Sequence, residues 1–136
     1  MSGAGPVGIV LVSHSGPVAE SVAALARGLA AGGATVPVAA AGGTADGGLG
    51  TSSELIARAV RSVDAGAGVA VLVDLGSALL TVKAMLAGGD ELPEGTELLD
   101  APFVEGAVAA VVTVSAGGDL AAVRASAGEA YEYRKV

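Results

Sequence analysis

Runs of aliphatic residues alternate along the chain with segments in which apolar residues recur every three or four positions. The first run, at residues 7–12, is almost wholly aliphatic, as is typical of a parallel strand covered on both faces. Comparable apolar runs predict further strands at residues 35–40, 68–73 and about 97–99. The chain is therefore expected to alternate strands with helices.

The spacing of apolar residues predicts helices between these strands. A helix that starts near Pro17 and stops before the glycines at 32–33 places four aliphatic residues on one face: Val18, Val22, Leu25 and Leu29. After a Gly-rich loop at 41–50, Thr51, Ser52 or Ser53 can cap a second helix with this apolar face: Leu55, Ile56, Ala59, Val60 and Val63. A third helix is expected from residues 76–78 to about residue 87, before a polar, acidic turn at 88–95.

The segment 103–115 is ambiguous, because its valines favour a strand while its apolar spacing matches a helix. We predict a helix that is apolar nearly all round, and therefore buried, in part against a second subunit. Asp119 is expected to cap a last helix at about 120–130, and residues 131–136 form a polar tail.

This alternation predicts an α/β fold: an open, mainly parallel sheet of strand order 2-1-3-4 with helices on both faces. The 136 residues show no internal repeat or domain boundary. We therefore expect a single domain over residues 1–136, with its core at about 7–130.

The amino-acid composition excludes several classes of function for this protein. The chain is 52% hydrophobic but only 2% aromatic, so its core must consist mainly of Ala, Val and Leu. A net charge of −7 argues against a nucleic acid partner. Without cysteine there is no disulfide or thiol chemistry. No basic segment precedes the first apolar run, which is too short to span a bilayer, so we expect a cytoplasmic protein without membrane insertion.

The only histidine, His14, stands in a polar turn directly after the first strand. In strand order 2-1-3-4 the first and third strands are neighbours at roughly 5 Å, which would bring Asp74 from the end of the third strand beside His14. Asp74 could then hold one ring N–H and stabilise positive charge on the imidazole. A helix-capping or otherwise structural role for His14 stays open at this point.

Small polar residues accompany His14 in the loops expected at the same edge of the sheet. Backbone N–H groups and helix N-termini suit a phosphoryl group better than a metal ion. The candidate phosphate-binding residues are Ser15, Gly16, Gly43, Thr51, Ser52, Gly76 and Ser77. Each of these loops, taken singly, also fits an ordinary strand-to-helix connection.

Several familiar sites are missing from the sequence. It contains no P-loop, no Gly-x-Gly-x-x-Gly after the first strand and no Gly-x-Ser-x-Gly. One histidine without cysteines argues against zinc, so we predict no metal and no cofactor. A histidine phosphatase requires an arginine beside the histidine and a second histidine, and both are missing here. Nucleophilic chemistry at a lone imidazole remains, which can carry a phosphoryl group without a metal.

Four motifs occur in order: Val-Ser-His-Ser at 12–15, Gly-Thr-Ser at 50–52, Asp-Leu-Gly-Ser-Ala at 74–78 and Ala-Pro-Phe-Val-Glu-Gly at 101–106. Together they resemble the mannose-type enzyme IIA domains of the phosphoenolpyruvate-dependent phosphotransferase system, in particular the phosphotransfer subunits of bacterial dihydroxyacetone kinases. The similarity covers roughly residues 7–124. Phe103 stands where an aliphatic residue is expected, a change in the core rather than in the chemistry.

The resemblance implies a phosphotransferase component in which His14 is transiently phosphorylated and Asp74 is its hydrogen-bonded partner. It implies phospho-HPr as donor, and ADP on a nucleotide-binding kinase subunit as acceptor. The regenerated ATP then phosphorylates dihydroxyacetone held by a third subunit. It also implies a homodimer. Longer members of the family carry HPr-like and enzyme I-like domains downstream on the same chain, and we expect those domains to be separate proteins, deleted or absent here.

Two other functions are compatible with the same residues. A regulatory domain of this fold would be phosphorylated for signalling or sugar uptake rather than to supply a kinase. A small tetrapyrrole metal chelatase also uses a histidine at a strand end, but it requires a second histidine, which the chain lacks.

Overall fold

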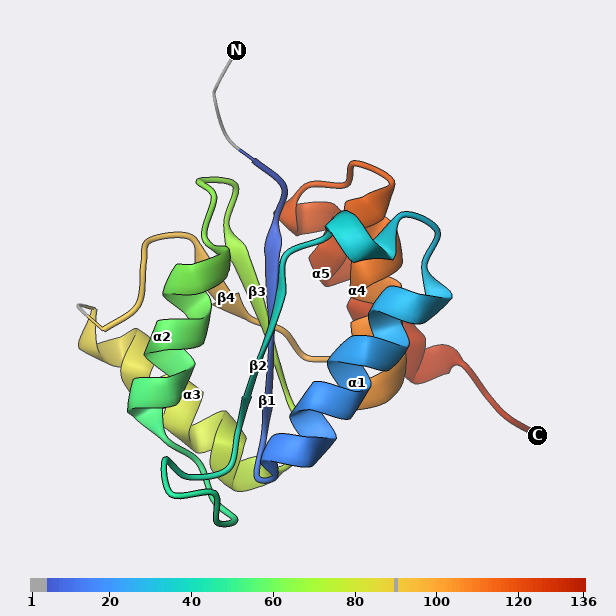
Figure 1. The fold of residues 1–136 in the computed structure, drawn as a ribbon. Helices are drawn as coiled ribbons and strands as arrows, with labels where there is room; N and C mark the ends of the chain where they lie inside the picture. The colour runs from blue at the N-terminus through green and yellow to red at the C-terminus, as the bar shows by residue number, and fades with distance from the viewer. Residues whose placement is uncertain (1–4, 90) are drawn as a thin grey trace.

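The computed structural model describes residues 5–89 and 91–136, and its centre is a four-stranded parallel sheet. The strands are β1 (Gly8–Ser13), β2 (Val38–Gly42), β3 (Val69–Val73) and β4 (Thr96–Leu98). Their spatial order is β2-β1-β3-β4, and all three pairings are parallel (Figure 1). The predicted fold class and strand order are confirmed.

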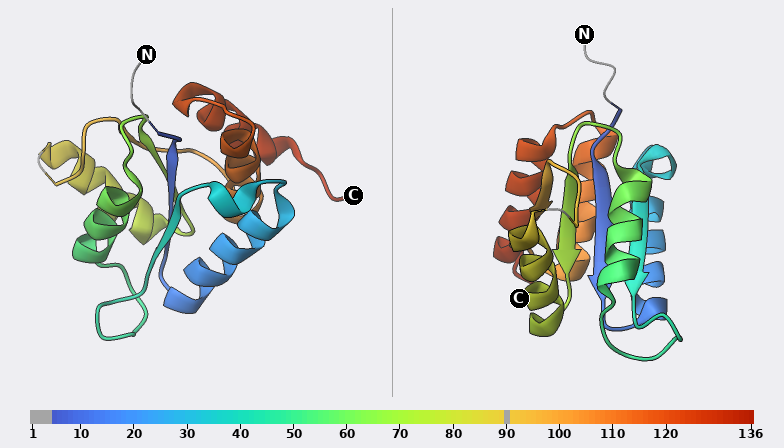
Figure 2. Two further views of the ribbon diagram at one scale, coloured as in Figure 1. Left: turned by 45° about the horizontal axis from the view of Figure 1, so that its top comes forward. Right: turned by 90° about the vertical axis from the view of Figure 1, so that its left-hand side faces the viewer.

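Helices cover both faces of the sheet. They are α1 (Gly16–Leu29), α2 (Ser53–Val63), α3 (Gly76–Gly88), α4 (Phe103–Ser115) and α5 (Leu120–Glu129). Figure 2 shows α1, α4 and α5 on one face and α2 and α3 on the other. No helix within residues 5–89 and 91–136 is long and apolar enough to cross a membrane.

The strand residues alternate between two hydrophobic layers, as the pleat of a strand requires. Ile9 and Leu11 of β1 pack with α1, α4 and α5, whereas Val10 and Val12 pack with α2 and α3. Since both layers are apolar, β1 is buried along its whole length. A strand buried in this way is a rigid support for the residue that follows it, His14.

The second strand begins later than predicted, at Val38 rather than Thr35, and continues through Gly42. Residues Gly33–Thr35 form instead a 3-10 turn, η1. Gly32 adopts a left-handed conformation with φ of 76°, so the chain is still reversing direction there. The fourth strand also lies one residue earlier than predicted, at Thr96–Leu98.

Helix α1 buries a face different from the one that its large aliphatic residues suggest. Its buried residues are Ala19, Val22, Ala23 and Ala26, while Val18, Leu25 and Leu29 are exposed. Small side chains allow α1 to lie close to the sheet and α4, and the larger ones are left on the outside. Of the four residues predicted on the inner face, only Val22 lies there.

The ambiguous segment is a helix, α4, as predicted. Its inner side, which includes Gly106 and Ala110, is buried against the sheet and α5, but Val104 and Val112 on its outer side are 41% and 45% exposed. The burial expected all round α4 is therefore not reached within one chain. At the end of the chain, a second 3-10 turn, η2, spans Ala130–Glu132.

Candidate functional site

His14 and Asp74 meet at the carboxyl edge of the sheet, because β1 and β3 are directly paired there. Val12 lies opposite Val73 in the register, and the Asp74 N–H donates to the Val12 carbonyl at 3.1 Å. The carboxyl ends of β1 and β3 lie together at the lower end of the molecule in Figure 1, so the residues that follow the two strands are close to one another. His14 Nδ1 lies 2.9 Å from Asp74 Oδ1, and the two side chains are 23% and 16% exposed.

The Asp74 carboxylate is held by hydrogen-bond donors on both oxygens. Oδ2 accepts from the Ser13 hydroxyl at 2.8 Å and from the His14 backbone N–H at 3.1 Å. Oδ1 accepts from the Leu75 N–H at 2.7 Å, in addition to its contact with His14 Nδ1. Three donors besides the imidazole therefore fix the position of this carboxylate.

These donors determine the charge on Asp74 and the tautomer of His14. Partial burial raises the pKa of the Asp74 carboxyl, but the hydrogen bonds from Ser13, from the His14 backbone and ring and from Leu75 outweigh it and hold the pKa below its ordinary value. An ionised carboxylate can only accept, so Nδ1 must carry the proton. The lone pair of His14 is then on Nε2.

Nε2 points toward the first turn of α3, where it contacts the Ser77 hydroxyl. A neutral imidazole protonated on Nδ1 accepts at Nε2, so Ser77 is the donor in this contact. The backbone N–H groups of Gly76 and Ser77 have no acceptor among the described residues, as is usual in the first turn of a helix. Nε2 therefore contacts the hydroxyl of a helix turn whose first two N–H groups have no acceptor among the described residues.

Two other predicted phosphate-binding hydroxyls cap helices. Ser15 Oγ accepts from the Val18 N–H at 3.3 Å at the start of α1, and Ser52 Oγ accepts from the Leu55 N–H at 3.2 Å at the start of α2. Thr51 Oγ1 lies 3.2 Å from Thr81 Oγ1 of α3. These contacts place all three residues at the carboxyl edge, but not in contact with the imidazole.

The two remaining predicted residues, Gly43 and Gly16, differ in whether their backbone N–H is available to a phosphoryl group. The Gly43 N–H donates to the Ser13 carbonyl at 3.1 Å, and Gly43 is buried with a left-handed φ of 71°. Gly43 thus continues the strand pairing into the loop, and its N–H is occupied. Gly16 is the first residue of α1, and its N–H has no acceptor within the described part of the chain.

Ser13 is the site residue that the sequence prediction missed. It is only 1% exposed, and its hydroxyl both donates to Asp74 and accepts from the Ser15 N–H at 3.1 Å. Among the described residues it is the one buried polar side chain. A signal was present in the sequence: a serine in line with a buried strand needs a partner for its hydroxyl.

A cavity of about 710 Å³ adjoins the site on the side of β4. Asp74, Leu75 and Gly76 form its border with the His14 site, and Phe103 and Tyr131 lie on its wall. Within residues 5–89 and 91–136, no group of three His, Asp or Glu side chains could hold a metal ion.

Comparison with known proteins identifies relatives over most of the chain. A family model described as "EIIA-man: PTS system fructose IIA component" matches residues 8–124. The chain is 38% identical over 107 residues to the phosphoryl donor subunit DhaM of PEP-dependent dihydroxyacetone kinase 2 of Listeria innocua, covering 78% of this chain and 84% of that protein. It is 34% identical over 131 residues to the corresponding subunit of Escherichia coli, covering 95% of this chain but only 28% of that protein.

Solved structures agree with this fold. A crystal structure of a protein of unknown function superposes with a TM-score of 0.77 at 28% identity, covering 91% of this chain and 94% of the other. A sigma-54 interaction domain protein from Enterococcus faecalis superposes with a TM-score of 0.66 at 19% identity, covering 96% and 93% of the two chains. At that identity the second likeness concerns the fold alone.

Proposed function

The chain belongs to the EIIA-man family, and on this premise we propose that it is a phosphohistidine relay. In this proposal His14 takes a phosphoryl group from phospho-HPr and passes it to ADP on the nucleotide-binding subunit of a dihydroxyacetone kinase. The observation that carries the proposal is the pairing of His14 Nδ1 with Asp74 Oδ1 at 2.9 Å, which leaves Nε2 as the ring nitrogen whose lone pair can react.

Nε2 is the nucleophile in this mechanism, and Asp74 is its positioning residue. The Nε2 lone pair attacks phosphorus, a P–N bond forms, and the bond from phosphorus to the donor breaks with its electron pair leaving on the donor. The proton stays on Nδ1, shared with Asp74, so the carboxylate balances the positive charge that develops on the ring. No proton has to leave the site during the transfer.

Gly76 and Ser77 are the best supported of the candidate phosphate-binding residues. Their unpaired N–H groups stand at the N-terminus of α3, and the Ser77 hydroxyl touches the reacting nitrogen. When Nε2 is phosphorylated, the hydroxyl turns from the nitrogen to a phosphoryl oxygen. Helix N-termini favour anions, so the group is stabilised without a metal ion.

The kinase role rests on the relatives' names. The Listeria and Escherichia proteins are both described as phosphoryl donor subunits of PEP-dependent dihydroxyacetone kinases. We transfer that role to this chain together with its partners: phospho-HPr as donor, the ADP-binding subunit as acceptor and, through it, the dihydroxyacetone-binding subunit. A cytoplasmic location follows from those partners.

A homodimer is part of the same proposal. Val104 and Val112 leave the outer side of α4 apolar and exposed in a single chain, and a second copy would cover them. Light scattering of the purified protein should give twice the chain mass, and a monomer would end this part of the proposal.

The relay is tested by labelling from phosphoenolpyruvate. Incubation with radiolabelled phosphoenolpyruvate, enzyme I and HPr should give a label on this protein that is acid-labile and alkali-stable, as expected for a phosphoramidate bond. The His14→Ala variant should take up none. Retained label in that variant would remove His14 from the mechanism.

Coupling to the kinase subunits separates the relay from the regulatory alternative. The phosphorylated protein, added to ADP-loaded kinase subunits and dihydroxyacetone, should form dihydroxyacetone phosphate. Normal labelling of His14 without product would favour a regulatory domain phosphorylated for signalling or sugar uptake.

A further inference from the structure

Strand β2 is one edge of the sheet, and the backbone groups of alternate residues along it point away from the other strands. The Gly43 N–H, directly after β2, donates to the Ser13 carbonyl of β1 at 3.1 Å. Only every second residue of a parallel strand bonds to the same neighbour, so the odd-numbered residues of this segment bond to β1. The backbone groups of Val38, Ala40 and Gly42 therefore point outward.

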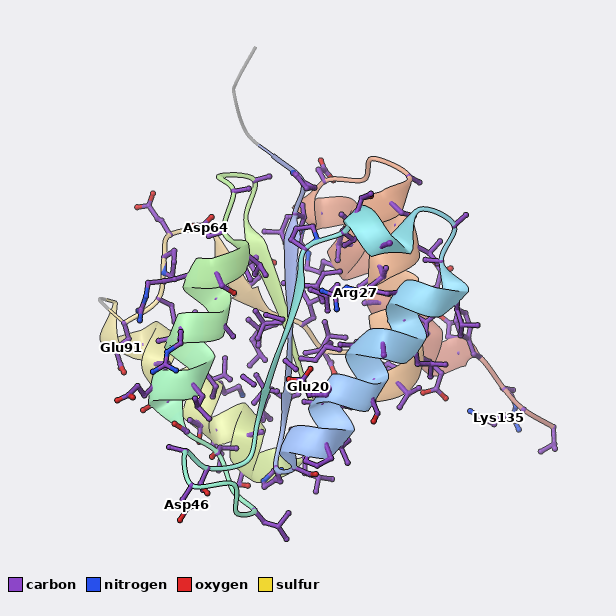
Figure 3. All side chains as sticks on the ribbon, in the orientation of Figure 1. Glu20, Arg27, Asp46, Asp64, Glu91 and Lys135 are labelled. Atoms are coloured by element: carbon purple, nitrogen blue, oxygen red, sulfur yellow. The ribbon has the colours of Figure 1, made fainter. Side chains whose placement is uncertain are left out.

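Arg27 of α1 covers only the amino end of this edge. Its guanidinium donates to the Val38 carbonyl, and Figure 3 shows Arg27 beside the strand. The N–H and the carbonyl of Ala40 have no partner among the described residues. Neither a proline nor a charged residue stands within Val38–Gly42, although these are common means of keeping an edge strand from pairing. The middle of β2 is therefore open to pairing with a further strand.

A groove of about 380 Å³ follows this edge between α1 and α2. Its floor consists of residues 39–42 of β2, and Figure 1 shows the strand running between the two helices. The floor residues are three alanines and a glycine, and Ala59 and Ser62 on the α2 wall are also small. Small side chains leave room for an added backbone at the spacing of about 4.8 Å that neighbouring strands keep.

Opposite charges stand on the two walls of this groove, with Glu20 on α1 and Arg58 on α2. Both helices begin at the carboxyl edge of the sheet, and these residues lie about 6 and 8 Å along them. Ala40 lies about 7 Å back from the same end of β2, so the two charges flank its unpaired backbone groups. Among the described residues Arg58 forms one ion pair, with Glu54 of its own helix at 3.5 Å, and an exposed pair of this kind is weak.

We propose that β2 pairs with an extended segment of a partner protein, which adds a fifth strand to the sheet. The segment donates to the Ala40 carbonyl and accepts from the Ala40 N–H, as in other peptides bound by strand addition. Successive side chains of a strand point to opposite faces, so a basic side chain meets Glu20 and an adjacent acidic one meets Arg58. His14 does not line this groove, and binding here is therefore independent of the relay.

A second copy of this chain matches the groove less well than such a segment. Antiparallel pairing of two β2 strands around a two-fold axis places α1 beside α1 and α2 beside α2. Glu20 then shares its face with a second glutamate, and Arg58 shares its face with a second arginine. Like charges oppose this pairing, whereas a segment of alternating charge satisfies both walls.

The peptide Thr-Val-Lys-Glu-Val-Thr is the probe, and its Kd should lie below about 1 mM by fluorescence anisotropy. Saturating peptide should slow amide hydrogen exchange at the Ala40 N–H at least about tenfold. Ala40→Pro removes only an outward N–H, and it should raise the Kd at least about tenfold with the circular dichroism spectrum unchanged. Ala45→Pro is the matched control, because Ala45 is the second residue of an exposed turn closed by the Gly47 N–H and the Thr44 carbonyl at 3.0 Å. The Kd of this control should stay within about twofold of the wild-type value.

A change of charge on one wall tests the alternation without altering the backbone of β2. Wild type should bind the Lys-Glu peptide at least about threefold more tightly than Thr-Val-Lys-Lys-Val-Thr, and Arg58→Glu should invert this preference. Arg61→Glu is the control, because it makes the same charge change on the same helix outside the groove, and it should keep the wild-type preference.

Three results would overturn the proposal. The first is an equal Kd in wild type and Ala40→Pro, or no binding to wild type at all. The second is the same inversion in Arg58→Glu and Arg61→Glu, because attraction would then follow net charge alone. The third is protection of the Ala40 N–H without peptide that rises with protein concentration, which would assign the edge to a second copy.

Discussion

Replacing Ser13 by alanine tests whether Asp74 is held in place as an ionised group. Ser13 is 1% exposed, and its hydroxyl donates to Asp74 Oδ2 at 2.8 Å while it accepts from the Ser15 N–H at 3.1 Å. The variant loses a hydrogen bond to a charged group and leaves the partly buried Ser15 N–H without an acceptor. Each loss costs on the order of 1–3 kcal/mol, and we expect the free energy of unfolding at pH 7 to fall by about 2–3 kcal/mol in total.

The pH dependence distinguishes the two losses. The pKa of Asp74 is lowered in the fold, so its contribution to stability is present above the ordinary carboxyl value of about 4 and is lost as pH falls through the folded value. Without the Ser13 hydroxyl that pKa moves up toward its ordinary value. The difference in stability between wild type and Ser13→Ala should therefore be largest at neutral pH and shrink in acid.

Urea unfolding followed by circular dichroism, at pH 7 and at several values below about 4, measures this difference. Ser62→Ala is the matched control, because the Ser62 hydroxyl only donates to the Ala59 carbonyl of its own helix. We expect that control to change stability by less than about 0.5 kcal/mol at every pH. A Ser13→Ala difference that is the same at neutral and acid pH would refute the reasoning, because Ser13 would then not act through a charged Asp74.

The remaining predictions concern the site and its supporting loop. Asp74→Ala should slow transfer from phospho-HPr about 100-fold, or about 2.7 kcal/mol of barrier, with the fold intact by circular dichroism; an unchanged rate would remove Asp74 from the mechanism. Ser77→Ala should lower the same rate about tenfold and shorten the lifetime of the phosphorylated protein, measured by loss of label, whereas Thr81→Ala on the next turn should leave both within about twofold. Gly42→Ala should cost at least about 2 kcal/mol in urea unfolding, because its Cβ would lie 2.3 Å from the Ser15 carbonyl oxygen; wild-type stability would contradict the close packing of these two loops.

The sequence was informative wherever one physical rule dominated. Buried parallel strands are apolar on both faces, so β1 and β3 could be located to within a residue, and strand pairing then brought His14 and Asp74 together. The inner face of α1 was predicted wrongly, because hydrophobic spacing gives most weight to large residues such as Leu25 and Leu29. Close packing between helix and sheet favours alanine instead, and alanine carries little signal of its own.

The rotamer of His14 was beyond sequence reasoning for a different reason. Which ring nitrogen faces Asp74 depends on the side-chain torsions and on the register of β1 against β3, not on residue type. The role of Ser13 depends on the same register, which turns its hydroxyl toward the carboxylate rather than into the core. The sequence therefore indicates that the Ser13 hydroxyl needs a partner, but neither that partner nor the rotamer of His14 follows from residue types alone.

The parts of the site that fix the imidazole are separate from the parts that meet a partner. Asp74 receives a buried hydroxyl and two backbone N–H groups, so its orientation does not depend on the exposed leucines beside the site, Leu75 and Leu80. Changes at these two leucines should therefore alter which protein reaches Nε2 without altering the nucleophile, whereas changes at Ser13 or Asp74 should slow every donor alike. The ratio of the rate with phospho-HPr to the rate with phosphoramidate, a small donor that needs no protein surface, measures this separation. It should fall in the Leu75→Ser/Leu80→Ser variant and stay constant in Ser13→Ala. A ratio that falls equally in both would mean that docking and chemistry are not carried by different residues.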